Sequence, residues 1–248
     1  MLRRAEHWIL MRAAEAAARL RAPEAVLAVS RRGVRLFAAD DPAAPAWWLS
    51  VAVREPEAAG GRAVAAPPAE VWGALRATWG RAGTRAEAGP GAVRLEGRSA
   101  AAEIRGRAVG FGAGAGIPAG GGGELVLGDH GPAAVADAPP ALAADVAAVA
   151  ARSDAVELRF ARDGRGWWIE VGGDGRVRRT PARMLLLPPG DAVAGRYPAP
   201  VLAELLSLSG LADLTVELTE PPGRPAFRAG WDAAAPRARV EVFSAPAD

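Results

Sequence analysis

The chain has 248 residues, of which 50% are apolar or aromatic, and 30 basic residues face 28 acidic ones. These values describe a folded protein with one large or two modest domains and exclude a disordered tail. Cysteine, lysine, asparagine and glutamine are absent. Their absence excludes disulfides, thiolate nucleophiles, cysteine-ligated metal sites, Schiff-base lysines and phosphate loops of the Walker type.

The remaining polar residues offer little catalytic chemistry. All 30 basic residues are arginine, and the histidines are His7 and His130, too few for a histidine-rich metal site. Asp40 and Asp41 could bind a hard cation, but adjacent acids in a proline-rich loop more often form turns. We therefore expect no catalytic residues, no metal and no cofactor. We also expect a cytoplasmic protein, because no apolar run reaches the roughly 18 residues of a membrane helix or follows the N-terminus as in a signal peptide.

The first half of the chain alternates between helical and strand-like patterns. Apolar residues at helical spacing predict a helix over residues 12–20, followed by a hairpin with its turn at residues 30–33. A further strand starts at Trp47, and Pro68 opens a second helix in the first-turn position that proline favours. The predicted elements are helices at 12–20 and 71–79 and strands at 25–29, 34–38, 47–53, 92–96 and 100–105.

A similar succession recurs after a shift of about 130 residues. A short helix is predicted at residues 142–152, a strand at 156–160 and a turn at 161–164, and another helix starts near Pro198, where the first half has Pro68. The repetition indicates a duplicated α+β unit. The alternative is a chance similarity between two stretches of an alanine-rich chain.

Pairs of tryptophans accompany this repetition. Trp47 and Trp48 begin one predicted strand, and Trp167 and Trp168 begin another that we expect to be equivalent. Because side chains alternate along a strand, one tryptophan of each pair should point inward and the other outward.

A glycine-rich segment at residues 110–132 separates the halves. It has no regular period, which predicts an interdomain connector. Its glycines recur at every second position, so the GxGxxG spacing of nucleotide-binding loops does not fit. The expected fold is α+β, with two similar domains at residues 1–109 and 133–248. In each domain, two short helices should pack on antiparallel sheet.

Two α+β halves joined by a long connector resemble the sliding clamp of archaea and eukaryotes, proliferating cell nuclear antigen (PCNA). The resemblance covers essentially the whole chain, and its most specific part is a closing strand that ends in Ala245 and Pro246. The other matching residues are Ser30, Gly33, Val34, Leu36 and Asp40 in the first hairpin, Ile117 and Pro118 in the connector, and Tyr197, Leu202, residues 214–218, residues 225–227 and residues 240–244 in the second half.

The chain also departs from the PCNA pattern. Its connector is richer in glycine, the aromatic pair before the closing Ala-Pro is reduced to Phe243, and the family is commonly acidic overall. These departures suggest a divergent archaeal paralogue that forms one subunit of a heterotrimeric ring.

The resemblance implies binding to duplex DNA without reading its sequence. A clamp lines its hole with helices whose basic side chains meet phosphates. Arg12 and Arg19 are seven residues apart and so share a helix face, whereas Asp145 and Glu204 oppose the basic residues of the second half. For any single arginine, an ordinary solvated helix face is an equally good interpretation. The implied DNA-binding residues are Arg12, Arg19, Arg21, Arg76, Arg81, Arg152 and Arg196.

The resemblance further implies a hydrophobic pocket beneath the connector that binds short peptide motifs of partner proteins. The alternative is plain loop and edge packing, which we favour for Trp48 and weigh evenly for the others. The residues that map to the pocket are Trp48, Ile117, Pro118, Pro225, Ala245 and Pro246.

The implied function is a non-enzymatic, nucleoid-associated processivity factor. It would tether DNA polymerase, ligase and nuclease to duplex DNA after a clamp loader places it there. A homotrimer or a heterotrimer with paralogues would pair sheet edges near residues 109–112 and 182–187 of successive subunits. One alternative is a clamp-like scaffold, of the checkpoint-clamp kind, that is not loaded for replication. Another is a small-molecule enzyme, against which the absence of clustered catalytic groups counts.

Overall fold

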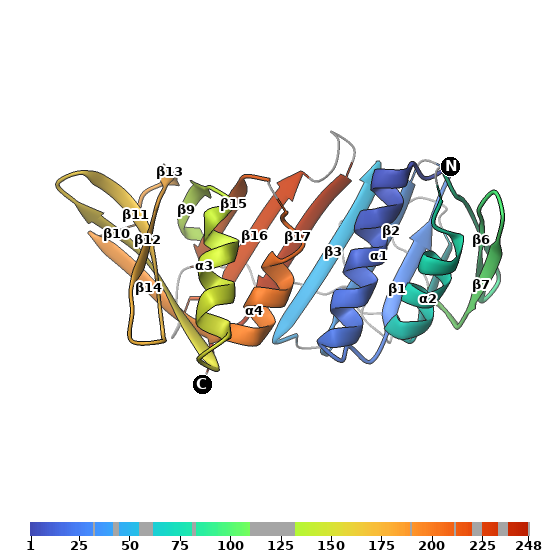
Figure 1. Ribbon diagram of the computed structural model, residues 1–248, viewed down its shortest axis with the longest axis horizontal. Helices are drawn as coiled ribbons and strands as arrows, with labels where there is room; N and C mark the ends of the chain where they lie inside the picture. The colour runs from blue at the N-terminus through green and yellow to red at the C-terminus, as the bar shows by residue number, and fades with distance from the viewer. Residues whose placement is uncertain are drawn as a thin grey trace. The chain divides into compact units, whose positions relative to one another are not determined.

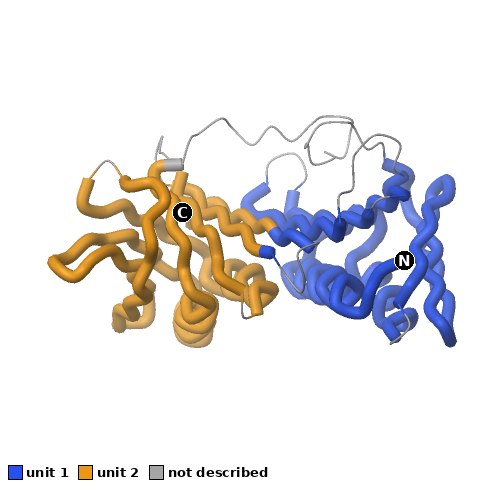
Figure 2. The backbone as a smooth tube through the Cα atoms, turned by 90° about the horizontal axis from the view of Figure 1, so that it is seen from above, with its two compact units in different colours: residues 1–127, 232–240 blue, residues 128–231, 241–248 orange. Residues whose placement is uncertain are grey.

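The structure, a computed structural model, describes residues 1–31, 33–41, 45–54, 62–80, 83–109, 132–188, 190–210, 212–219, 225–232 and 238–247. The chain divides into two compact units, one of residues 1–127 with 232–240 and one of residues 128–231 with 241–248 (Figure 2). The predicted connector at 110–132 lies outside the described residues except for Pro132. Within the described ranges, no helix combines the length and apolar character needed to cross a membrane.

The first unit carries two helices on antiparallel strands (Figure 1). Hydrogen bonds order its strands as β3-β2-β1-β4-β8, and β5, β6 and β7 form a separate sheet. The helices α1 and α2 pack against each other, with α1 on β2 and β3 and α2 on β6 and β7. The elements are α1 Arg4–Arg19, β1 Ala25–Val29, β2 Gly33–Ala39, β3 Trp47–Arg54, β4 Arg62–Ala66, α2 Pro68–Thr78, β5 Arg85–Gly89, β6 Ala92–Glu96, β7 Ala101–Arg105 and β8 Arg107–Val109.

The second unit also consists of helices and antiparallel strands. One sheet has the order β12-β11-β10-β14, and a second set follows the order β13-β9-β15-β16. The helices α3 and α4 contact each other, and α3 also packs on β10 and β11. The elements are β9 Pro132–Ala138, α3 Ala141–Ala150, β10 Ala155–Asp163, β11 Gly166–Gly172, β12 Arg178–Pro181, β13 Arg183–Leu186, β14 Ala192–Pro198, α4 Ala199–Leu206, β15 Leu214–Thr219, β16 Phe227–Asp232 and β17 Ala238–Ser244, which is divided between the units after residue 240.

The two units share the same internal order. In the first, α1 is followed by strands that pair as β3-β2-β1-β4 and then by α2; in the second, α3 is followed by strands that pair as β12-β11-β10-β14 and then by α4. The predicted α+β class, with helices packed on antiparallel sheet, is confirmed.

Small side chains bring α1 close to its sheet. The buried face of α1, which packs on α2, β2 and β3, includes Ala13, Ala14, Ala16 and Ala17. Strand β1 is buried along its whole length because α2 and β5 also contact it. The long polar side chains of α1 are consequently concentrated on the face that points away from the sheet.

The first helix begins at Arg4, eight residues before the predicted start at residue 12. The Glu6 carboxylate accepts a 2.7 Å hydrogen bond from the backbone N–H of Arg3, which satisfies one of the amide groups that a helix start leaves unpaired. Ile9 and Leu10 already belong to the buried face, so the helix gains apolar contacts from its second turn onward.

The prediction that the tryptophan pairs occupy equivalent strands is wrong. Trp47 and Trp48 begin β3, the third strand after α1, whereas Trp167 and Trp168 lie in β11, the second strand after α3. Trp47 and Trp48 are both buried because β3 is covered on both faces. Trp167 and Trp168 are both half-buried. Neither pair shows the expected division into one inward and one outward ring.

A buried histidine joins α1, α2 and the segment that leads into β5. The Nε2 atom of His7 donates a 2.7 Å hydrogen bond to the Leu75 carbonyl, and its Nδ1 lies 2.7 Å from Thr84 Oγ1. Thr84 Oγ1 is also 3.0 Å from the Thr78 carbonyl. Burial lowers the pKa of His7 below its usual value, so the folded state holds this ring neutral.

This histidine makes stability depend on pH. As the pH falls below the unfolded-state pKa of about 6.5, the unfolded chain gains a proton at His7 that the folded chain still resists. We expect the free energy of unfolding, measured with denaturant, to decrease from about pH 7.5 to about pH 5.5. A His7→Gln variant should lose this part of the pH dependence. An equally steep decrease in that variant would assign the effect to other groups.

Candidate functional site

The outward face of α1 carries a regular stripe of long side chains. Arg4, Trp8, Arg12, Glu15 and Arg19 follow one another at spacings of three or four residues and are exposed or half-buried. Such spacing places side chains on one face of a helix. The helix α2 packs beside α1 (Figure 1). It carries Trp72 and Arg76, and Trp79 directly follows its last residue.

Two of these arginines share one carboxylate. Glu15 lies 2.7 Å from Arg12 Nη1 and 2.6 Å from Arg19 Nη2. The three side chains therefore carry one net positive charge. Exposed pairs of this kind add little to stability, so Arg12 and Arg19 can exchange Glu15 for another anion at small cost.

The other two arginines of this face lie over tryptophan rings. The guanidinium carbon of Arg4 is 5.2 Å from the centre of the Trp79 ring, and that of Arg76 is 5.2 Å from the centre of the Trp72 ring. These are cation–π contacts. Among the described residues neither arginine has an acidic partner, so both positive charges remain uncompensated.

The remaining predicted DNA-binding arginines lie elsewhere. Arg21 is exposed in the turn after α1, with a positive φ of 59°. Arg81 lies outside the described residues. Arg196 is on β14, where its register partner is Glu157. The structure thus brings Arg12, Arg19 and Arg76 into one helix layer and leaves Arg21 and Arg196 off it.

Arg152, at the end of α3, belongs to a polar cluster of the second unit. It is 3.8 Å from Asp174, whose buried carboxylate accepts shorter hydrogen bonds from Arg178. Hydrogen bonding to Arg178 lowers the pKa of Asp174 to about 2. The outward positions of α3 itself are alanines, among them Ala144, Ala147 and Ala148.

Sequence reasoning missed Arg4, Trp8, Trp72 and Trp79 in this layer. The predicted helix began too late to include Arg4 and Trp8, and the tryptophans were assigned mostly to the core. The spacing of Arg4, Trp8 and Arg12 at intervals of four residues could have indicated that these side chains share one face of a longer helix.

The predicted partner-binding residues fall into separate places. Ile117 and Pro118 lie outside the described residues. Trp48 is only 2% exposed and packs near Phe37 in the first unit, with ring centroids 6.4 Å apart. Trp48 therefore belongs to the buried core of the first unit.

Pro225 and the C-terminal segment are both attached to the end of β14. The buried Tyr197 hydroxyl donates a 2.8 Å hydrogen bond to the Pro225 carbonyl, and burial raises the pKa of that hydroxyl. The backbone N–H of Ala247 donates to the Arg196 carbonyl at 2.7 Å, which places half-buried Ala245 and Pro246 beside the same strand. Pro225 is thus joined to β14 through the Tyr197 side chain, and the C-terminal segment through the backbone of Arg196.

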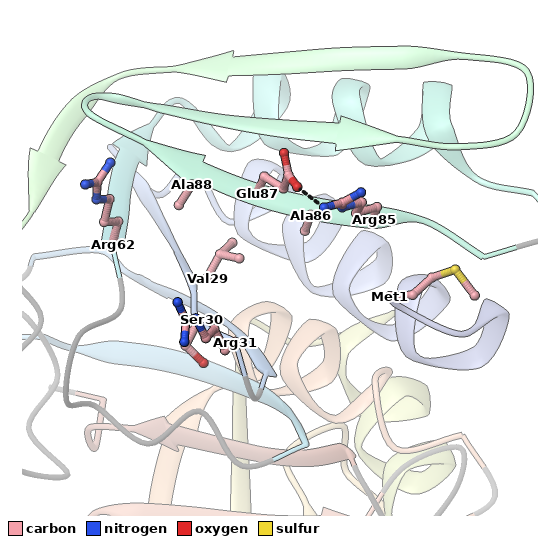
Figure 3. A pocket seen from close by; sticks show the side chains of 9 residues that line it. All are labelled: Met1, Val29, Ser30, Arg31, Arg62, Arg85, Ala86, Glu87 and Ala88. Atoms are coloured by element: carbon pink, nitrogen blue, oxygen red, sulfur yellow. Dashed lines mark ion pairs between the residues drawn. The ribbon is translucent and has the colours of Figure 1, made fainter.

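A depression of about 750 Å³ lies on another part of the first unit (Figure 3). Its polar lining residues are Ser30 and Arg31 of the first hairpin turn, Arg62 at the start of β4, and Arg85 and Glu87 on β5. Its apolar lining residues are Met1, Val29, Ala86 and Ala88. Arg85 and Glu87 form an ion pair. None of the predicted site residues lines this depression. It forms where β1 approaches β5, a contact that the sequence pattern did not indicate.

Within the described ranges, no group of three or more histidine or acidic side chains is placed to hold a metal ion.

Comparisons with known proteins identify the fold. No protein-family model and no curated protein matches the sequence. Solved structures do match. PCNA from A. fulgidus, bound to the C-terminal region of FEN-1, has a TM-score of 0.67 at 16% identity over 97% of this chain and 96% of that one.

Two further structures agree with the first. PCNA from Thermococcus kodakaraensis has a TM-score of 0.62 at 14% identity and covers 94% of this chain and 95% of that chain. The beta clamp of H. pylori, in complex with 5-chloroisatin, has a TM-score of 0.58 at 13% identity over 91% of this chain and 55% of that one. The chain therefore has the sliding-clamp fold, which PCNA and the beta clamp share.

Proposed function

We propose that the chain is a subunit of a ring-shaped DNA sliding clamp. Such a ring tethers DNA polymerase and other replication and repair enzymes to duplex DNA and performs no chemistry of its own. The observation that carries the proposal is a layer of arginine-bearing helices on a sliding-clamp fold. Its place of action is the nucleoid in the cytoplasm.

The DNA-facing surface is the layer formed by α1 and α2. Arg12, Arg19 and Arg76 lie on it as the resemblance implied, and Arg4 joins them. Contacts from arginine to phosphate are independent of sequence, which suits a ring that slides. Arg21, Arg81, Arg152 and Arg196 are proposed as further DNA-contacting residues, without being assigned to this layer.

Ring closure uses strand edges that are open in the single chain. In the first unit β8 lies at the end of a strand order, and in the second unit β12 and β13 do so. Next to them the chain exposes large apolar side chains: Val177, Leu185 and Leu187 are all more than half exposed. Exposed edges with apolar neighbours favour pairing with another subunit. We propose that β8 of one subunit pairs with residues 182–187 of the next, in a homotrimer or a heterotrimer with paralogues.

Partner proteins dock at the end of β14. Pro225 accepts a hydrogen bond from Tyr197 of this strand, and the segment of Ala245 and Pro246 is bound to the neighbouring Arg196. Ile117 and Pro118 of the connector are proposed to complete the pocket. Support comes from the A. fulgidus PCNA structure, which contains the C-terminal region of FEN-1. The proposed clients are polymerase, clamp loader, ligase and nuclease, each through a short peptide motif.

The first test is the mass in solution. Sedimentation or light scattering should give three times the 25.4 kDa subunit mass, for the chain alone or mixed with its paralogues. Replacing Leu185 and Leu187 with Glu should produce monomers, because it places carboxylates in the apolar contact. Replacing Ala147 and Ala151 with Glu adds the same charge away from that edge and should leave the ring intact. A wild-type chain that stays monomeric with every paralogue contradicts the ring.

The second test is binding to duplex DNA across a salt series. Replacing Arg12, Arg19 and Arg76 with Ala should weaken binding and reduce the salt slope by about 0.9 for each phosphate that the variant no longer neutralises. Replacing Arg94, Arg98 and Arg105, all exposed around the β5-β6-β7 sheet, removes the same charge and should have little effect. Equal losses in both variants would mean that only net charge matters. Ring assembly without DNA binding would favour the clamp-like scaffold that is not loaded for replication.

The third test concerns the peptide pocket. A synthetic peptide from the C-terminal region of a FEN-1 nuclease should bind the wild-type chain, and Ala245→Asp should weaken it at least tenfold, because it buries a charge against apolar groups. Ala192→Asp, at an exposed position of β14, is the matched control. Calorimetric titration gives both affinities. Equal affinities for the wild-type chain and Ala245→Asp would place the pocket elsewhere.

A further inference from the structure

We propose that the α1–α2 face binds DNA that has unpaired bases, such as a gapped duplex, by stacking those bases on Trp8 and Trp79. The inference rests on the proposed function, because it concerns the same DNA-facing surface. It goes further by naming the DNA structure that this chain prefers.

The first observation is the exposure of these rings. Trp8 is 40% exposed and Trp79 is 41% exposed, although each indole would gain free energy from full burial. Trp72, on the adjacent helix, is half-buried. These three tryptophans lie on or directly after two neighbouring helices, and none of them is among the buried residues of those helices.

The second observation is how the arginines lie among the rings. Arg4 lies over Trp79 and Arg76 over Trp72. An arginine held on a ring keeps its full charge, whereas one held by a carboxylate loses it. Trp79 keeps 41% of its surface exposed with Arg4 in contact, and Trp8 is 40% exposed on the same helix as Arg4 and Arg12, so two exposed indoles lie among positive charges. That combination matches a nucleotide, which has a flat base beside a negative phosphate.

Intact duplex DNA offers no free base face on which these tryptophans could stack. Its base faces are stacked on one another, and a sliding ring meets only phosphate and sugar. Unpaired bases expose both faces and can stack on an indole. Alanine substitution of such stacking residues weakens binding by roughly fivefold to a hundredfold for each base.

Charge argues against a second copy of this chain as the occupant. Arg4, Arg12, Arg19 and Arg76 share the face, with Glu15 as the acidic member of the α1 stripe. Two such faces in contact would oppose like charges across an interface with little to neutralise them. A polyanion with exposed aromatic bases offers negative charge to the arginines of this face and flat rings to its tryptophans.

The experiment compares two DNA ligands of equal length, an intact duplex and the same duplex with a short single-stranded gap. Fluorescence anisotropy at low ionic strength gives both affinities for the full chain. The wild type should bind the gapped DNA at least tenfold more tightly. The double variant Trp8→Ala/Trp79→Ala should lose this preference while its duplex affinity changes less than about twofold.

Two controls separate stacking from other effects. Trp8→Phe/Trp79→Phe keeps aromatic faces and should retain most of the preference. Trp167→Ala removes a half-buried tryptophan from a strand of the second unit and should retain all of it. Melting curves and solution mass, measured for every variant, confirm that the fold and the assembly persist.

The possible outcomes test the preference for gapped DNA separately from the proposed clamp function. Equal binding of both DNA ligands by the wild type, unchanged in the alanine variant, overturns the inference and leaves the clamp function standing. Failure to bind either ligand overturns both. A change of solution mass in the alanine variant identifies the face as a protein contact and also overturns the inference. Loss of preference in the alanine variant alone supports it.

Discussion

Close packing of alanine-lined helices on antiparallel sheet is the constraint on which the rest of each unit depends. A helix can approach a sheet closely only where its inner face carries small side chains, and α1 meets this condition with its four buried alanines at 13, 14, 16 and 17. The arginines of α1 then have no room beneath the helix and point away from the sheet. The fold thereby assigns core packing to one helix face and leaves the other free for function.

That freedom explains why two units of the same internal order carry different surfaces. The outward positions of α1 and α2 hold arginine and tryptophan, whereas α3 exposes alanines such as Ala144 and Ala147. Packing constrains only the buried faces, which are mainly apolar in both units. The exposed faces are free to differ, so the proposed DNA surface is concentrated in the first unit.

The environment of each arginine decides whether its charge is available. In the second unit, Arg178 binds Asp174 and Arg179 binds Glu170 and Asp163, so these charges are already neutralised. On the helix layer of the first unit, Arg4 and Arg76 lie on tryptophan rings instead. A ring fixes the guanidinium group without cancelling its charge, which is what a surface for a polyanion requires.

The sequence by itself determined the features that depend on neighbouring residues. The strands at 25–29 and 92–96 were predicted with their correct bounds, because strand-forming residues stand there between turn residues. The α+β class and the chemistries excluded by composition followed in the same way. The Arg12–Glu15 pair also depends only on helical spacing.

Tertiary structure decided the features that join distant residues. Strands β4 and β5, rich in alanine, had no strong local signal and exist as partners of β1 and β6. The ion pair between Glu6 and Arg54 joins residues far apart in sequence. The neighbouring sequence also could not predict that Trp47 and Trp48 are both buried, or that Trp8 and Trp79 are exposed. The physical reason is that strand pairing and side-chain burial depend on which distant segments cover a residue, and local periodicity carries no record of that.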